Sequence, residues 1–530
     1  MKNTISLIKN AKVGDIVPIV ETLPYALKPV EYFAKLSDYG NKKNCILLES
    51  ADIILKYGER SLGSAEPCLK VQGKNEDFEI TALNDLGKRF IKFLKGDFDF
   101  CDKVVYKKDK ITGKLKPKRG FVSEEARLKL TNHSNIIRTI AFKFKATKKP
   151  FIPYAGLFGS ISYDFIDQFE DLPKNKEDIV QDPDYLFYFL DNLFLIDHKE
   201  NKTYFVANAL ITDSNKDNIY NECLSKIKNY RETTNKDIPK KNNYTGNSKN
   251  NVKSDTSKKE FMDKVKKLKN HIIAGDIFQA VISRTIISDF NKEPLDIYKK
   301  LRKLNPSPYM FFINNSNGLL LGASPEMSLR VEGDKKKIAE IRPIAGTKPR
   351  GIVNNKINSD LDSRYETELK IDQKEVSEHT MLVDLARNDV AKISEPGTRY
   401  VNEPFVVEKY SHVQHLVSNV SGILKSNLDA LHAYIATMNM GTLTGAPKVE
   451  AMKLLRKYEK TKRGFYGGAV GYITPNKDLD STIVIRSIRI KGNKAYIRAG
   501  AGIVYDSNPE SEFTETENKA AACLRAIEND

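Results

Sequence analysis

The chain has 530 residues, of which 40% are hydrophobic and 29% charged, as expected for a globular protein large enough for two or more domains. Its net charge of +17 invites a nucleic-acid-binding interpretation, but the lysines lie in scattered runs that are not interleaved with aromatic residues, so we expect no nucleic-acid partner. The five cysteines form neither a CxxC pair nor a metal-ligand spacing, which predicts reduced thiols in a cytoplasmic protein.

The first half of the chain is predicted to be rich in strands with some helices. Its apolar and alternating runs predict strands at 45–48, 152–158, 186–196 and 203–210. The most apolar segment, 185–196, is interrupted by Asp191 and Asn192 and therefore predicts buried strands rather than a membrane span. The amino-terminal residues lack a long apolar stretch and a small-residue cleavage site, so no signal peptide is expected.

A polar stretch at 231–259 divides the chain. It contains almost nothing apolar and cannot bury enough surface to offset its ordering entropy, which predicts a linker or a long surface loop. The expected organisation is therefore an amino-terminal domain at 1–230, this linker, and a carboxyl-terminal domain at 260–530.

The second half mixes helices and strands. Helices are predicted at 258–275, 363–391, 449–455 and 514–527. Strands are predicted at 281–287, 309–313, 319–322, 468–473, 482–490 and 495–503. This mixture favours an α+β fold with a large mixed sheet region flanked by helices.

Two acidic segments carry carboxylates on a helical face that should point inward. In the first segment the face combines two carboxylates with two apolar side chains: Glu375, Glu378, Leu382 and Leu385. In the second segment the face contains Glu512, Glu515, Lys519 and Cys523. An inward carboxylate is costly unless a cation meets it, and a divalent ion such as Mg²⁺ between the helices would meet both pairs. The alternative is two solvated acidic helix faces.

Three turns made of small residues could approach a ligand closely. Gly346 and Thr347 follow a strand, and Gly500-Ala501-Gly502 ends one, where glycine often marks close approach of a ligand. The segment 441–448 resembles a phosphate loop but continues with Ala-Pro-Lys instead of Gly-Lys-Ser/Thr, which excludes that motif. Each turn has a purely structural alternative, as a loop, a helix cap or a packing contact.

Two polar side chains stand in apolar surroundings. Arg486 lies within an otherwise apolar strand pattern, where a guanidinium needs a carboxylate from the protein or from a substrate. His415 is likewise embedded among apolar residues, and taken alone such a histidine is more often a hydrogen-bonded core residue than a catalyst.

The sequences of these segments and their order along the chain closely resemble those of the chorismate-utilising enzymes, and within that family those of the anthranilate synthase component I branch. The resemblance covers nearly the whole chain except 231–259 and parts of 60–150. It rests on LLES (47–50), YDFIDQFEDLP (163–173), GDIFQ (275–279), NPSPYMFF (305–312), LGASPE (321–326), PIAGTKPRG (343–351), EVSEHTMLVDLARND (375–389), YSHVQHLVS (410–418), MGTLTGAPK (440–448), RGFYGGAVGY (463–472), IVIRS (483–487), AGAGIVYDS (499–507) and ETENKA (515–520).

The resemblance implies a sheet-on-sheet sandwich flanked by helices and an enzyme that displaces the C4 hydroxyl of chorismate. Family members that add water carry a lysine base at the position of Gln279, and glutamine cannot act as a base. Aminodeoxychorismate synthases typically carry a lysine at the position of Ala345. The absence of both lysines favours direct attack by ammonia and formation of anthranilate and pyruvate.

The same resemblance implies roles for individual residues. Glu378 and Glu515 would ligate Mg²⁺, and Glu375 and Glu512 would support its water shell. Chorismate would be held by Gly346, Thr347, Tyr466, Arg486 and the backbone of Gly500, Ala501 and Gly502. The catalytic set would be Glu326 as general acid, His415 as the base for the C2 proton, Thr442 lining the site, and Gln279.

The amino-terminal half would carry much of a tryptophan effector site, formed with Ser50, Pro308, Tyr309 and Met310. No cysteine lies in a G-x-C-x-G glutaminase setting, so ammonia should come from a separate glutaminase subunit, in an α2β2 assembly as in relatives. The expected protein is cytoplasmic, binds no membrane, and catalyses the first committed step of tryptophan biosynthesis under feedback inhibition. Two alternatives are an aminodeoxychorismate synthase component I and a non-catalytic tryptophan-binding homologue.

Overall fold

We analysed a computed structural model of the chain, which describes residues 2–51, 59–118, 120, 122–146, 150–175, 177–240, 251–354, 356–410 and 413–528. Part of the predicted linker, 241–250, lies outside these described residues. On either side of it, α6 (Lys216–Thr234) continues into the polar stretch, and α7 (Lys258–Ile273) begins before the stretch ends. Within the described part of the chain, no helix is long and apolar enough to cross a membrane.

The described strands form two large sheets. In spatial order the first sheet contains β13 (Lys253–Ser254), β14 (Gln279–Asp289), β28 (Lys494–Ile503), β27 (Ser487–Lys491), β16 (Gly318–Ser324), β15 (Tyr309–Asn315), β2 (Cys45–Glu49), β3 (Arg60–Ser64), β11 (Asn192–Asp197), β12 (Lys202–Leu210), β1 (Asp15–Leu23) and β8 (Lys145–Ala146), with β24 (Gly445–Ala446) beside β14.

The second sheet contains, in spatial order, β19 (Ile344–Pro349), β23 (Val413–Ile423), β18 (Ile338–Ile341), β17 (Met327–Glu332), β26 (Leu479–Ile483), β25 (Ala469–Ile473), β9 (Gly156–Ile161), β10 (Tyr185–Leu190), β4 (Leu69–Lys74), β5 (Asp77–Ala82), β7 (Lys110–Lys114) and β6 (Lys103–Tyr106), with β22 (Tyr400–Lys409) beside β23. A small hairpin of β20 (Ile352–Val353) and β21 (Lys356–Ile357) stands apart.

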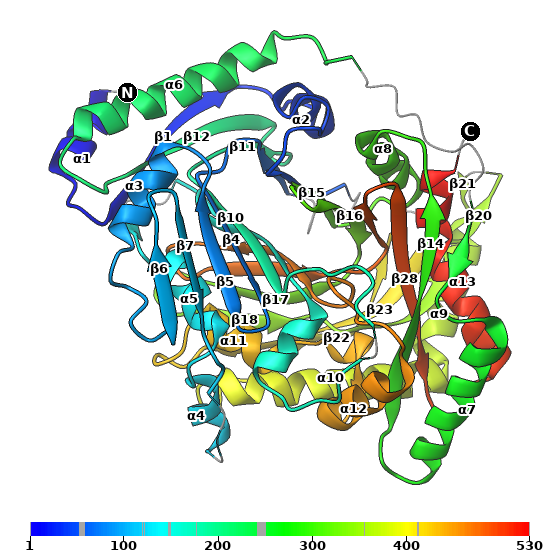
Figure 1. Cartoon of the computed structure of the whole chain (residues 1–530). Helices are drawn as coiled ribbons and strands as arrows, with labels where there is room; N and C mark the ends of the chain where they lie inside the picture. Colours follow the sequence, from blue (N-terminus) through cyan, green and yellow to red (C-terminus); the bar gives the residue numbers. More distant parts are fainter. Residues whose placement is uncertain are drawn as a thin grey trace.

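Helices flank both sheets. They are α1 (Lys2–Asn10), α2 (Pro29–Leu36), α3 (Asp85–Phe93), α4 (Glu124–Leu128), α5 (His133–Ala141), α6, α7, α8 (Pro294–Leu304), α9 (Ser359–Ile371), α10 (Gln373–Ile393), α11 (Ala430–Thr437), α12 (Lys448–Tyr458) and α13 (Pro509–Ile527), with 3₁₀ turns η1 (Tyr163–Gln168) and η2 (Gly441–Leu443). Figure 1 shows α6 along β1 and β12, and α7 and α13 beside β14 and β28 at the opposite end of the same sheet. The predicted α+β class is confirmed.

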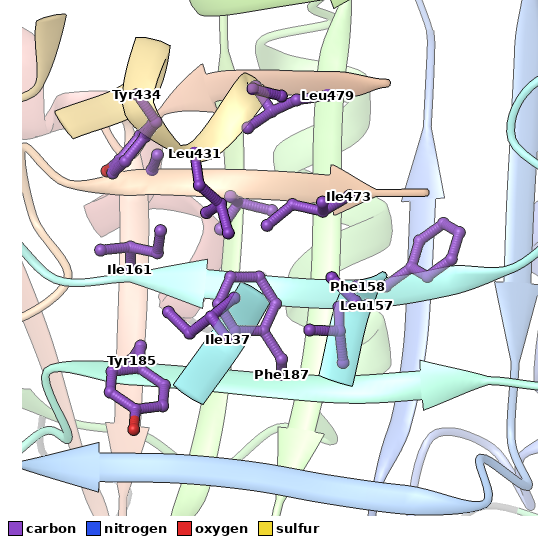
Figure 2. Packing of buried hydrophobic residues seen from close by; sticks show 14 of the residues in the cluster. Ile137, Leu157, Phe158, Ile161, Tyr185, Phe187, Leu431, Tyr434, Ile473 and Leu479 are labelled. Atoms are coloured by element: carbon purple, nitrogen blue, oxygen red, sulfur yellow. The ribbon is translucent and has the colours of Figure 1, made fainter. Parts of the chain in front are cut away.

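The hydrophobic core is formed by side chains of both sheets and of the helices that pack on them. Its largest cluster of buried side chains joins strands of both sheets to helices α5, α10 and α11. Figure 2 shows Ile137 of α5 and Leu431 of α11 packing over the strands that carry Leu157, Ile161 and Ile473. Separate clusters pack α2, α6, α8 and α13 on the first sheet, and α7 and α12 on β14 and β28.

Both sheets contain strands from each half of the chain. In the first sheet β2 pairs with β15, from Glu49–Met310 to Cys45–Asn314. In the second sheet β9 pairs with β25 through five residue pairs, from Ile161–Ala469 to Leu157–Ile473. The backbone ladders therefore run without interruption across the predicted boundary at 231–259.

Among the points where the chain passes from one sheet to the other, two are neighbours in space. Strand β16 of the first sheet leads through Pro325 and Glu326 into β17 of the second, and β26 of the second leads through 484–486 into β27 of the first. The two crossings are hydrogen-bonded, from Ala323 N–H to the Arg486 carbonyl (3.1 Å) and from Ile483 N–H to the Glu326 carbonyl (3.0 Å). The predicted single strand at 482–490 is therefore wrong, because the chain changes sheets inside it.

Candidate active site

Helices α10 and α13 carry the two acidic segments, and both begin just before their carboxylates. The side chain of Asp372 caps α10 by accepting from the N–H groups of Lys374 and Glu375. The side chain of Asn508 caps α13 in the same way, followed by Pro509 at the first helical position. The first-turn carboxylates Glu375 and Glu512 therefore lie where the helix dipole favours negative charge.

The four carboxylates lie close enough to repel one another. Burial raises the pKa of Glu378, and the negative charge of Glu515 raises it further. Burial also raises the pKa of Glu375, with Glu378 adding to the effect, and the pKa of Glu512, with Glu515 adding to it. Lys519 pairs with Glu515 and partly compensates this accumulation of negative charge.

This arrangement fits a hard divalent cation bound by few protein ligands. No group of three or more His, Cys, Asp or Glu side chains is arranged to hold a metal among the residues that the structure describes. Mg²⁺ commonly takes one or two carboxylates and completes its shell with water and an anionic substrate. Glu378 of α10 and Glu515 of α13 match that donor set, and a cation between them would relieve their mutual repulsion.

Strand β28 contributes glycines where side chains converge. A Cβ at Gly502 would lie 2.9 Å from Nε2 of Gln279, which in turn donates to Oε1 of Glu378 at 3.2 Å. A Cβ at Gly500 would lie 3.2 Å from the hydroxyl of Tyr466. The side chain of Ala501 belongs to the core cluster of α7 and α12, so only its backbone can face a ligand.

Glu326 lies at the first crossing and is 5% exposed. Burial raises the pKa of its carboxyl group to about 8, opposed by the neighbouring Thr442 hydroxyl and by the charge of Lys519. One carboxyl oxygen of Glu326 and the hydroxyl of Thr442 are both buried without a hydrogen-bond partner among the described residues. A protonated carboxyl group therefore faces the site beside the Thr442 hydroxyl.

Arg486 lies at the second crossing, in the left-handed region at φ 49°. Its guanidinium is half-buried, and among the described residues it makes neither a hydrogen bond nor an ion pair. Burial lowers the pKa of this guanidinium, while the nearby Tyr466 opposes the decrease. A positive φ is costly for a residue other than glycine, and a half-buried guanidinium without an ion pair needs an anion, which a substrate can supply.

His415 lies on β23, opposite Thr347 of β19. Its Nδ1 lies 2.8 Å from the Thr347 hydroxyl and 3.4 Å from the Gly346 carbonyl, which can only accept. Nδ1 therefore carries the proton, and Nε2 is free to accept one. Burial lowers the pKa of His415 to about 4, so the ring is neutral near pH 7.

Gly346 joins this group to the carboxylates. It adopts φ 72°, and a Cβ there would lie 3.0 Å from Oε2 of Glu375 and 2.9 Å from Leu369. The metal, acid, base and chorismate residues predicted from the sequence thus form one connected group, linked by these contacts and by the charges of Arg486 and Lys519.

The predicted effector residues lie elsewhere, around a cavity of about 250 Å³. Strands of both sheets line it, and Ser50, Pro308, Tyr309 and Met310 all contribute. Its polar groups include a network that the sequence did not predict, in which Tyr309 donates to Asp480 (3.0 Å) and Arg330 donates to both (3.1 Å each). Arg330 and Asp480 lie 150 residues apart in the chain, so no local sequence pattern indicates their contact.

Lys519 was predicted only to share a helical face with the carboxylates. Besides pairing with Glu515, it donates to the Gly500 carbonyl at 3.1 Å. The i, i+4 spacing of Glu515 and Lys519 indicates their ion pair from the sequence alone. The contact of Lys519 with β28 depends instead on how α13 packs against that strand.

Comparison with known proteins agrees with this architecture. The family model of the chorismate binding enzymes matches residues 104–525. Anthranilate synthase component 1 from Vibrio cholerae is 39% identical over 507 residues, covering 95% of each chain. The protein of the same name from Buchnera aphidicola subsp. Pemphigus spyrothecae is 40% identical over 512 residues, again covering 95% of each.

Solved structures are similar over most of the chain. Anthranilate synthase component I from Streptococcus pneumoniae superposes with a TM-score of 0.69 at 28% identity, covering 88% of this chain and 92% of that one. The menaquinone-specific isochorismate synthase from Escherichia coli has a TM-score of 0.62 at 15% identity, covering 99% of each chain, and shares the fold. The chain therefore belongs to the chorismate-binding enzyme family. Its curated relatives group it with the anthranilate synthase component I branch of that family.

The carboxylate site predicts direct metal binding without substrate. Glu378→Gln and Glu515→Gln should each weaken binding of Mn²⁺, used as a paramagnetic substitute for Mg²⁺, at least about tenfold, because each removes a charged ligand. Titration followed by electron paramagnetic resonance of free Mn²⁺ measures this. Glu517→Gln, on the exposed side of α13, is the matched control and should bind as the unaltered protein does. Equal affinity in all four proteins would rule out these two ligands.

Proposed function

We propose that this protein converts chorismate and ammonia to anthranilate and pyruvate, as the large subunit of an anthranilate synthase in tryptophan biosynthesis. The observation that carries the proposal is the group formed by Glu326, Arg486 and His415. It combines a buried protonated acid, a cation without an ion pair among the described residues, and a neutral base, with the carboxylates of α10 and α13 beside them.

The nucleophile follows from the two positions where lysines are absent. Gln279 is 2% exposed and donates its amide N–H to Glu378, so it cannot remove a proton from water. Ala345 is buried and offers no amine for covalent attack. Ammonia needs neither group, because it is already a nucleophile when it reaches C2 of chorismate.

Glu326 would supply the proton for the C4 hydroxyl, which leaves as water when ammonia adds at C2. A carboxyl group with a pKa of about 8 still holds its proton at neutral pH and can donate it. Nε2 of His415 would then take the C2 proton while the C3–O bond breaks and the ring becomes aromatic. The released enolpyruvate would take up a proton at its methylene carbon to become pyruvate. The Thr347 and Gly346 contacts hold the ring of His415 for this step.

Binding would use the remaining groups of the site. Mg²⁺ on Glu378 and Glu515 would neutralise the ring carboxylate of chorismate. The Arg486 guanidinium and the Tyr466 hydroxyl would hold the anionic substrate from the other side, against the backbone of β28. The glycines of β28 leave room there that side chains would fill.

A separate glutaminase subunit would supply the ammonia, in an α2β2 assembly. The support is the name component 1 carried by the relatives, which implies a second component. Tryptophan would bind in the 250 Å³ cavity around Ser50 and Tyr309 and inhibit the enzyme. The cavity supports this because its lining combines polar groups, such as Arg330 and Asp480, with apolar ones, such as Pro308 and Met310.

The reaction can be tested with the isolated chain. Purified protein mixed with chorismate, Mg²⁺ and a high concentration of ammonium salt should produce anthranilate, followed by its fluorescence. Product chromatography provides the check. Isochorismate or aminodeoxychorismate as the sole product would overturn the assignment.

The acid and the base predict a bell-shaped pH dependence of kcat/KM. Glu326 must be protonated, so activity should fall as pH rises above about 8, and His415 must be neutral, so activity should fall below about pH 4. Rates should be compared at a constant concentration of un-ionised ammonia. Glu326→Gln should be folded and inactive. A variant with a near-normal rate would reject the acid role.

Tryptophan should inhibit the enzyme, and Ser50→Phe should reduce this inhibition at least about tenfold while leaving kcat within about twofold. A phenyl ring at Ser50 would project into the cavity and occupy the space of the ligand. Ser214→Phe, at an exposed turn, is the control. An unaltered protein whose activity stays constant up to saturating tryptophan would contradict the effector proposal.

A further inference from the structure

Three charged side chains are buried together next to the segments that carry Tyr466 and Gly500. Glu459 ends α12 and is 5% exposed, Arg463 is 5% exposed, and Arg498 of β28 is 7% exposed. We call these three residues the Glu459 cluster. Burying two guanidinium groups and one carboxylate costs desolvation free energy. We therefore expect this arrangement to have a role beyond filling the interior.

The carboxylate of Glu459 is the centre of this cluster. Its Oε1 accepts from the N–H of Ser283 (2.8 Å), the hydroxyl of Ser283 (2.7 Å) and a terminal nitrogen of Arg463 (2.7 Å). Its Oε2 accepts from Nε of Arg463 and a terminal nitrogen of Arg498, both at 2.9 Å. Burial alone would raise the pKa of Glu459, but the two guanidinium charges hold it at about 2.

Arg463 reaches the backbone of segments that carry site residues. One terminal nitrogen donates to the Leu443 carbonyl at 2.6 Å, next to Thr442, and the other donates to the Val281 carbonyl at 2.6 Å, two residues after Gln279. Tyr466 follows three residues after Arg463 itself. A shift of this guanidinium would therefore move three parts of the site.

Arg498 and Ser283 continue the ligand-facing side of β14 and β28. Ser283 lies opposite Gly500, and Gly502 lies two residues farther along the same face. The hydroxyl of Ser283 donates to Glu459 and accepts from Nε of Arg498 at 2.8 Å, so it bridges the two charges. The cluster is thus packed directly beside the strand backbone that would hold chorismate.

We propose that Glu459 is a positioning residue for chorismate binding, which acts by clamping Arg463 and Arg498 so that Tyr466, the turn at Thr442 and the β28 backbone keep one mutual geometry. This inference rests on the proposed use of these segments for chorismate. Glu326 and His415 lie on other segments, the β16–β17 crossing and β23. Loosening the cluster therefore weakens binding and leaves proton transfer in the bound complex intact.

The least disruptive test is Ser283→Ala, which removes the bridging hydroxyl. Its matched control is Ser288→Ala, a buried serine of the same strand whose hydroxyl donates to the neighbouring Asp289 carbonyl and has no other hydrogen bond among the described residues. Chorismate affinity is measured by equilibrium dialysis with Mg²⁺ and without ammonium, together with KM, kcat and the thermal midpoint. Ser283→Ala should raise the dissociation constant and KM about tenfold, the effect of losing one charge-assisted hydrogen bond, with kcat within about twofold.

Glu459→Gln is the more disruptive variant. Its amide N–H₂ is a donor facing guanidinium donors, so the contact with Arg498 or with Arg463 is lost. If folded, it should weaken chorismate binding more than Ser283→Ala does. Unchanged affinity in folded Ser283→Ala, or equal losses of affinity and thermal midpoint in both serine variants, overturns the proposal. The dialysis measures chorismate binding and does not depend on which product the enzyme forms. A product other than anthranilate from the unaltered enzyme would therefore reject the proposed reaction and leave the binding result valid.

Discussion

The paired crossing of the chain between the two sheets is the constraint on which the rest of the structure depends. Strands β16 and β17 run beside β26 and β27, and both pairs change sheets at the same level, held by the Ala323–Arg486 and Ile483–Glu326 backbone hydrogen bonds. A continuous strand would turn alternate side chains to opposite faces. The interruption instead aims a buried acid, Glu326, and Arg486 into the same space, and neither makes an ion pair among the described residues.

The charged side chains around this space between Glu326 and Arg486 do not balance one another, so we expect a ligand to complete them. Of the four carboxylates of α10 and α13, Glu515 pairs with Lys519, while Arg486 nearby has no ion pair among the described residues. The surplus of negative charge on one side suits a divalent cation, and the free guanidinium on the other suits an anion. A substrate that carries carboxylates and binds through a metal, as proposed above, would resolve both imbalances at once.

The sequence alone predicted much of this, for identifiable reasons. Helical spacing placed Glu375, Glu378, Glu512 and Glu515 on inward faces, and ordered motifs implied roles for Glu326 and His415. The strand pattern around Arg486 was misleading, because apolar residues on both sides of a sheet crossing look like one buried strand. The contacts of Glu459 with Arg498 and of Arg330 with Asp480 join distant strands, and only the sheet topology brings such partners together.

The continuity of both sheets across the polar stretch also limits how this protein can be divided. Parting the halves would break the β2–β15 and β9–β25 ladders and leave four strands with unpaired backbone groups. Long exposed edges of this kind recruit other chains and promote aggregation. Each half therefore completes the sheets of the other, and neither half alone retains the full strand pairing seen here.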